Sequence, residues 1–287
     1  LAGDTSQHVV LSSLWCIARI CEFHPRAIAN LDESSQDHLV AAFLRPLQAS
    51  SGAVVEKACY AILKFAEIAE LMQTADDQSN HLSRYFQDIL SQLLTATNRP
   101  DFNDVSSRSA VYSCYEAASA VVLNSAKGQR ELVQAILDEA VKRLAIALDE
   151  QQEPDRQRRI ALHGFLSPLI GNCVQKIDKQ ILMSQSIENT CITDVIVRQL
   201  IEVMKVEDGA TADALCCITQ VATNLEDDFK VYMDAIKPDI LKPLQEKTDA
   251  SACVMAVALI GDYCRILGDE ILSNFEFADQ LVGQYFE

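Results

Sequence analysis

The sequence predicts an all-α fold, an α-α superhelix or solenoid built from antiparallel helix pairs. The first observation is a repeat, because apolar segments with helical spacing recur at intervals of roughly 45 residues. Examples are WCIARICEFHP, ACYAILKFAEIAE, AVYSCYEAASAVV, ALCCITQVATNLE and CVMAVALIGDYC. The second observation is weak strand signal, since apolar alternation never persists and Asp208-Gly209 is the only hairpin-type dipeptide. The period is that of HEAT repeats, which let 287 residues bury their apolar faces in one continuous array.

The helices are expected to alternate between a first and a second helix of each pair. Apolar residues spaced by four, three and four positions mark 7–23 as a second helix that ends before Pro25; they are Val10, Leu14, Ile17 and Cys21. The pairs that follow are 36–48 with 54–71, 81–96 with 107–125, 130–148 with 155–177, 189–206 with 211–225, and 227–246 with 250–267. A lone first helix is expected at 269–286.

These pairs give about six repeats in a single continuous domain. The expected divisions are a half repeat at 1–30, repeats at 31–75, 76–127, 128–180, 181–225 and 226–268, and a half repeat at 269–287. No linker rich in Ser, Gly or Pro interrupts them, and the chain has only 9 Gly and 7 Pro. Because the array starts and stops in mid-repeat without polar capping helices, we expect a segment of a longer protein.

Composition narrows the classes of partner. The 41 acidic residues outnumber the 24 basic ones and give a net charge of −17, which disfavours nucleic acid and anionic membrane and favours a basic partner. No charge-free apolar run of about 18 residues occurs, so we expect no membrane insertion. The first residues, LAGDTSQHVV, lack the pattern of a signal peptide.

The cysteines and histidines give no indication of a metal site. None of the ten cysteines forms a CxxC pair, and the five histidines are scattered. Most of the cysteines fall on apolar helix faces, where a reduced thiol serves as a small buried hydrophobe in the cytosol or nucleus. Since no Gly-rich phosphate loop, nucleophile motif or ligand cluster is present, we expect no metal, no cofactor and no enzyme activity.

Several sequence segments are more specific for one protein family than the repeat period is. WCIARICEFHP, KACYAILKFAEIAE, TNRPDFNDVSSRSAVYSCYEAASAVVLNSAKG, FKVYMDAIKPDILKPLQ and VALIGDYCRILGDEI occur in an order and spacing that resemble the central part of the importin-β, or karyopherin-β, family of nuclear transport receptors. The resemblance extends over nearly the whole chain and is weakest from Glu150 to Val206.

The resemblance implies an import carrier without covalent chemistry. Its second helices would line an acidic concave surface that wraps the basic importin-β-binding helix of importin-α, or basic cargo. Its first helices would bind phenylalanine-glycine repeats of nucleoporins on the convex side, and the GTPase Ran in its GTP form would release the cargo. The implied location is cytoplasm and nucleus, with passage through the nuclear pore in the nuclear envelope.

Candidate cargo-binding residues follow from the same resemblance. Trp15, the only tryptophan, occupies a position where the family packs a ring on the bound basic helix, and Tyr60 takes the equivalent place in the next repeat. Ring faces beside carboxylates suit the stem and charged head of Lys or Arg. The full candidate set is Trp15, Glu22, Tyr60, Glu67, Glu70, Glu116 and Asp213. A core tryptophan and a solvated acidic face remain the alternatives, and Asp213 could instead stabilise a helix N-terminus.

A nucleoporin-repeat site would need an apolar slot between neighbouring first helices. The family's second such site lies in about the region of the last predicted repeats, where apolar residues are crowded. The candidates are Phe229, Tyr232, Met233 and Ile236, facing Leu272, Phe275 and Phe277. Ordinary packing between repeats is the alternative for each of them.

The sequence leaves two alternative functions to consider. A different HEAT-repeat scaffold, such as a phosphatase regulatory subunit or a vesicle-coat adaptor, would share the period without an acidic second-helix surface. An enzyme would need a catalytic motif that the sequence lacks. Binding of a basic helix distinguishes the carrier from the scaffold.

Overall fold

A computed structural model describes residues 4–71, 78–99, 104–184, 186–187, 190–206, 210–246 and 249–267. The chain divides into two compact units, Leu1–Ile136 and Leu137–Glu287, each of which is described by itself. Both units are helical, which confirms the all-α solenoid of helix pairs. Within the described ranges, β structure is limited to one antiparallel ladder between β1 (Ser186–Ile187) and β2 (Thr190–Cys191).

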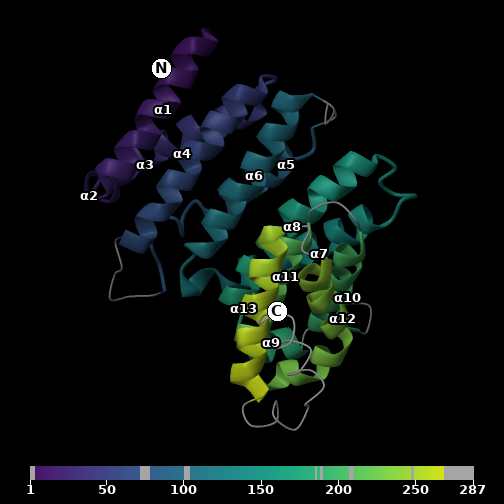
Figure 1. Ribbon diagram of the computed structural model, residues 1–287. Coiled ribbons are helices and arrows are strands. Elements are labelled where there is room, and N and C mark those ends of the chain that lie inside the picture. The colour runs from purple at the N-terminus through teal and green to yellow at the C-terminus, as the bar shows by residue number, and fades with distance from the viewer. Residues whose placement is uncertain are drawn as a thin grey trace. The chain divides into compact units, whose positions relative to one another are not determined.

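In the first unit the second helices pack side by side. They are α1 (Gln7–Phe23), α4 (Gly52–Leu71) and α6 (Val105–Leu123), and they follow one another across Figure 1. The first helices are α3 (Glu33–Leu44), which continues into the 3-10 turn η1 (Arg45–Gln48), and α5 (Phe86–Ala96). A short α2 (Pro25–Ala29) and the turn η2 (Lys127–Gln129) complete the unit, and α7 (Arg130–Leu148) leads out of it.

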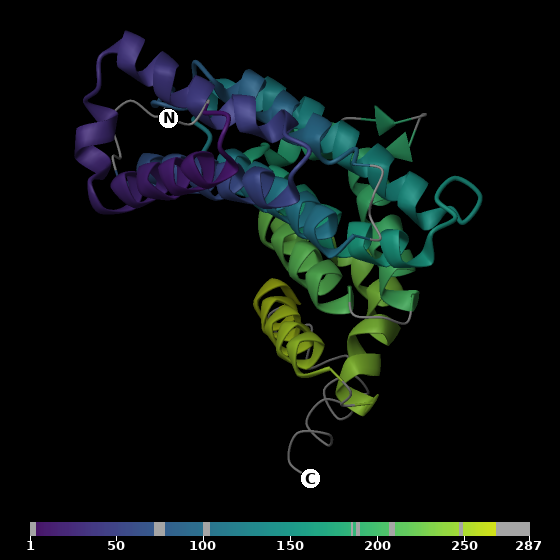
Figure 2. The ribbon, with the colours of Figure 1, turned by 90° about the horizontal axis from the view of Figure 1, so that it is seen from above.

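The second unit repeats this arrangement. Its second helices are α8 (Arg156–Lys176), α11 (Thr211–Leu225) and α13 (Ala250–Leu267), and α11 packs against both of the others. Its first helices α10 (Ile192–Lys205) and α12 (Lys230–Glu246) also contact each other (Figure 2). The short elements are α9 (Lys179–Ser184) and the turn η3 (Glu226–Phe229), and Glu226 has a positive φ of 52°.

The predicted helix positions agree with the structure, and the ends differ where local side chains intervene. Asp32 accepts from Ser35 N at 3.0 Å, so α3 begins three residues earlier than position 36. Asn80 accepts from Leu82 N at 3.0 Å and forms a turn, so α5 begins at Phe86 instead of 81. The expected helix at 269–286 lies outside the described residues.

Three short elements were not expected from the sequence. Pro25 starts α2 instead of only ending α1, because proline suits the first position of a helix. Helix α9 and the small β ladder lie in 179–191, the part of the chain where the family resemblance is weakest. Pro168 lies inside the continuous helix α8.

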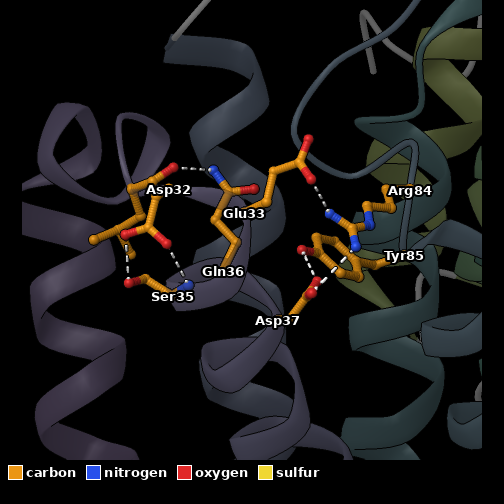
Figure 3. Close-up of polar contacts among 8 residues, drawn as sticks. Asp32, Glu33, Ser35, Gln36, Asp37, Arg84 and Tyr85 are labelled. Carbon is orange, nitrogen blue, oxygen red and sulfur yellow. Dashed lines mark hydrogen bonds and ion pairs between the residues drawn. The ribbon is translucent and has the colours of Figure 1, made fainter.

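The first helices of neighbouring repeats are tied near their N-terminal ends by an aspartate and a tyrosine. In the first unit Tyr85 donates its hydroxyl to Asp37 at 2.6 Å, and Arg84 pairs with both Glu33 and Asp37 at 3.1 Å (Figure 3). Burial and the Asp37 carboxylate raise the pKa of Tyr85 to about 12. The second unit contains an equivalent aspartate–tyrosine pair, in which Tyr232 of α12 donates its hydroxyl to Asp194 of α10 at 2.6 Å.

Two histidines, the buried His163 and the half-buried His81, bridge helix pairs through a backbone carbonyl. His81 Nε2 lies 2.8 Å from the Phe65 oxygen, and His163 Nε2 lies 3.0 Å from the Ala147 oxygen. The His81 ring also meets the Phe65 ring edge-on at 4.7 Å. Burial, only partly offset by these hydrogen bonds, lowers the pKa of both histidines, so each is neutral in the folded chain.

This arrangement predicts a loss of stability on mild acidification. Below about pH 6.5 the unfolded chain protonates histidines that the folded chain keeps neutral, so the free energy of unfolding falls as the pH decreases from about 7.5 to about 6. Urea unfolding followed by circular dichroism at the two pH values measures the change. The double variant His81→Gln, His163→Gln should lose part of this pH dependence. An unchanged pH dependence would contradict the attribution of the effect to these two histidines.

Candidate partner-binding site

Helix α1 presents an exposed aromatic side chain next to its buried stripe. Leu14 is completely buried, whereas Trp15 is 53% exposed, so the tryptophan is not a core residue. The guanidinium carbon of Arg19 lies 6.0 Å from the Trp15 ring centre and 4.3 Å from that of Phe23. Arg19 also pairs with Glu22 at 2.6 Å. The stretch of α1 from Trp15 to Phe23 therefore offers two rings, a cation and a carboxylate over about two helical turns.

Helix α4 repeats the combination around Tyr60. The amino groups of Lys57 and Lys64 lie 5.8 and 5.7 Å from the Tyr60 ring centre, and Lys64 pairs with Glu67 at 2.8 Å. Partial burial acts to lower the pKa of Lys64, but the Glu67 hydrogen bond and charge, together with the Tyr60 and Glu22 charges, raise it overall. Helix α1 packs against α4, and the Glu22 carboxylate of α1 is close enough to act on the Lys64 amino group of α4.

Helix α6 extends this surface. Tyr112 is 50% exposed and Glu116 is exposed beside it. Ser109 of α6 donates its hydroxyl to Glu56 of α4 at 3.0 Å, which ties the exposed sides of the two helices together. We call this surface the aromatic face; it consists of Trp15, Arg19, Glu22 and Phe23 of α1, Glu56, Lys57, Tyr60, Lys64 and Glu67 of α4, and Tyr112 and Glu116 of α6.

The expected acidic character of the second helices needs correction. The first unit's second helices carry the carboxylates Glu22, Glu56, Glu67, Glu70 and Glu116 against the cations Arg19, Lys57, Lys64 and Arg108. Those of the second unit carry Asp213 and Asp262 against Arg156, Arg158, Arg159, Lys176 and Arg265. Together the second helices carry seven carboxylates against nine cations, so the net negative charge of the chain lies outside them. Glu70 belongs to α4, but its side chain is outside the described part.

Asp213 lies apart from the aromatic face, in the second unit. It occupies the first turn of α11 and is half-buried. Burial, and secondarily the charge of Asp249, raise its pKa. Asp262 pairs with Arg265 of the same helix at 3.4 Å. These placements fit local roles at helix ends and within α13.

The apolar residues expected to form a slot are largely interior. Phe229 and Ile236 are completely buried and Met233 is 7% exposed, so the expectation that Phe229 and Ile236 line a surface slot is corrected. The Phe229 ring centre lies 5.7 Å from that of Tyr232 and 5.9 Å from that of Tyr263, because α12 packs closely on α10 and α13. Leu272, Phe275 and Phe277 lie outside the described residues.

A pocket of about 380 Å³ lies at the C-terminal ends of α3 and α5 in the first unit. Gln48 donates to Gln92 across it at 3.2 Å, and Arg99 donates to the carbonyl oxygens of Ala49 and Ser50 at 3.1 and 2.7 Å. Leu47 and Ala96 form the apolar part of the pocket wall, and the remaining residues that line it have small polar side chains.

The described residues contain neither a cluster of metal ligands nor a helix that could span a membrane. No three His, Cys, Asp or Glu side chains of the described part gather closely enough to hold a metal ion. The helices described are all too short or too polar to cross a bilayer. The cysteines are all free thiols, and the buried ones are Cys21, Cys59, Cys114, Cys173 and Cys217.

Sequence reasoning missed the cations of the aromatic face. Arg19 follows Trp15 by four residues and precedes Glu22 by three, and Lys64 has the same relation to Tyr60 and Glu67. This spacing brings side chains together on a helix surface, so it was the available signal. Tyr112 was also missed, although it lies on a predicted second helix.

Comparisons with known proteins agree on one family. A family model described as importin subunit beta-1-like, TPR repeats, matches residues 38–284. Importin subunit beta-1 of Arabidopsis thaliana is 25% identical over 278 residues, covering 95% of this chain and 31% of that protein. The Schizosaccharomyces pombe protein of the same name is 22% identical over 268 residues, covering 91% of this chain and 29% of its own length.

Solved structures share the fold over all of this chain and about a third of theirs. A crystal structure of importin beta in a polyethylene glycol condition has a TM-score of 0.85 at 23% identity and covers 100% of this chain and 33% of its own. A Kap95:Nup1 complex has a TM-score of 0.79, and a structure of Kap95p binding RanGDP has one of 0.76. Both are 19% identical and cover 100% of this chain and 32% of theirs.

Proposed function

The chain belongs to the importin subunit beta-1 family, and from that premise we propose that it is part of a nuclear import carrier whose aromatic face receives basic side chains of a helical partner. The partner would be the basic segment of importin-α or a cargo with its own basic signal. The carrier acts by shape and charge, without covalent chemistry or cofactor, and moves between cytoplasm and nucleus through the nuclear pore.

The aromatic face is the observation that carries this proposal. Trp15 and Tyr60 each stand beside a cation and within one or two helical turns of a carboxylate. Such a group attracts a Lys or Arg through the ring face and the carboxylate together. A partner helix lying across α1 and α4 would meet two such groups, and covering them would weaken their screening by water.

Ran and nucleoporins are proposed as further partners of the whole carrier. The support is the fold likeness to Kap95 in structures whose names include RanGDP and Nup1. Because Phe229 and Ile236 are buried, a nucleoporin slot in the second unit would have to use half-buried Tyr232 and residues such as Phe275 beyond the described part.

Removal of the two rings tests the cargo proposal. We expect the double variant Trp15→Ala, Tyr60→Ala to bind a basic helical peptide about tenfold or more weakly, because each ring contributes about 0.5–2 kcal/mol to a cation contact. Fluorescence anisotropy of a labelled peptide, at about 50 and about 200 mM salt, measures the affinity and its salt dependence.

The matched control is Trp15→Phe, Tyr60→Phe, which keeps both ring faces and should retain most of the affinity. Circular dichroism should show equal helix content in all three proteins. Binding that is independent of both rings and of salt would remove the cargo assignment and favour the generic HEAT-repeat scaffold.

A further inference from the structure

The sites proposed to receive a partner's cations already hold cations of this chain. Arg19 lies over Phe23 and at the edge of contact with Trp15 while pairing with Glu22. Lys64 lies by Tyr60 and pairs with Glu67, and its side chain is only 18% exposed. A partner's Lys or Arg therefore cannot take these places unless Arg19 and Lys64 leave them.

Local helix stabilisation alone does not explain both contacts. Lys205 and Glu202 of α10 form the same i,i+3 ion pair at 2.8 Å, and Lys205 is 56% exposed in its side chain. Within the part of the chain that the structure describes, Lys205 has no recorded ring contact. The ring and the deeper position distinguish Arg19 and Lys64 from an ordinary ion pair of a helix surface.

Charge balance then determines what a fitting partner must carry. Once a partner's cations pair with Glu22 and Glu67, the released Arg19 and Lys64 face those cations and lose the carboxylates with which they were paired. Like charges brought together at a covered surface oppose binding. A partner that also carries an acidic residue near each basic one supplies the missing counter-charge.

We propose that Arg19 and Lys64 are specificity-determining residues that occupy the ring sites in the free chain and select a helix of mixed charge over a purely basic one. The fitting partner has an acidic residue about one turn from each Lys or Arg. This proposal rests on the proposed function, because it assumes that the aromatic face binds basic side chains.

Two peptides and one pair of variants test the selection. The peptides have the same length and apolar positions, and one carries only Lys as its charged residues whereas the other has Glu four residues after each Lys. The double variant Arg19→Met, Lys64→Met keeps the unbranched stems and removes both charges. Lys205→Met is the control, since it removes a cation of a similar ion pair in the second unit. Anisotropy gives each affinity, and emission of Trp15 reports whether its surroundings change on binding.

For each peptide we compare its affinity for the variant with its affinity for wild type. The peptide's own helix propensity affects both affinities equally and therefore cancels in this ratio. We expect the double variant to improve binding of the all-Lys peptide by about three- to tenfold more than it improves binding of the mixed peptide. Lys205→Met should change both peptides by the same small factor. Helix content by circular dichroism should be equal in the three proteins.

Failure of this inference and failure of the proposed function look different. If wild type binds the peptides, but the double variant changes both affinities by one common factor, Arg19 and Lys64 select nothing and only the inference is overturned. If wild type binds neither peptide and Trp15 emission stays constant, the proposed function is wrong and the inference is overturned with it.

Discussion

Replacing Phe229 by alanine is expected to lower the free energy of unfolding of the second unit by about 3–5 kcal/mol, the usual cost of emptying a buried phenylalanine site. The ring is completely buried and contacts Tyr232 and Tyr263, so its removal leaves a cavity between α12 and α13. Urea unfolding followed by circular dichroism measures the loss.

The matched control for Phe229→Ala is Val231→Ala, two residues away and 76% exposed, which should change stability by about 0.5 kcal/mol or less. A ring that served mainly as a ligand contact would behave like this control. A small loss of unfolding free energy for Phe229→Ala would therefore support the surface slot and contradict the buried position of this ring.

The second large effect is expected for Phe65→Ala in the first unit, also about 3–5 kcal/mol. Phe65 is 1% exposed, its ring centre lies 5.6 Å from that of Phe43, and the His81 ring meets it edge-on. Loss of this ring removes the packing that joins α4 to α3 and to the turn before α5.

Phe65→Leu is the control, because it keeps most of the volume and should cost less than about 1.5 kcal/mol. Hydrogen exchange measured on individual peptides shows which part of the chain is destabilised. In Phe65→Ala the amides of α4 and α5 should lose protection, whereas amides of the second unit should not. Equal loss of protection in both units would contradict the separate packing of the two cores.

Helix positions could be predicted from the sequence because the apolar period is determined by which residues must be buried. The ends of α1, α7, α11 and α13 were predicted to the residue. The start of α5 was not, since a single Asn80 side chain decides between a turn and another helical turn. Such local competition leaves no trace in the apolar pattern.

The candidate site was predictable in part, for an electrostatic reason. The family resemblance placed Trp15 and Tyr60 on an accessible surface, and the structure leaves both at least partly exposed. A count of acidic residues could not show that Glu22 and Glu67 are paired with cations of their own helices. Nor can apolar residues such as Phe229 reveal whether they face a ligand or a neighbouring repeat, because both faces have the same composition.

The ties between α3 and α5 are unevenly placed, and this has a mechanical consequence for the first unit. Near the N-terminal ends, the Tyr85 hydroxyl and one arm of the Arg84 guanidinium both contact Asp37. At the other ends, long amide side chains span a pocket of about 380 Å³. Because the pocket separates the helices there, we expect a change in their spacing to be accommodated at the pocket end more easily than at the Asp37 end. The volume of this pocket would then change with the spacing of α3 and α5 in the first unit.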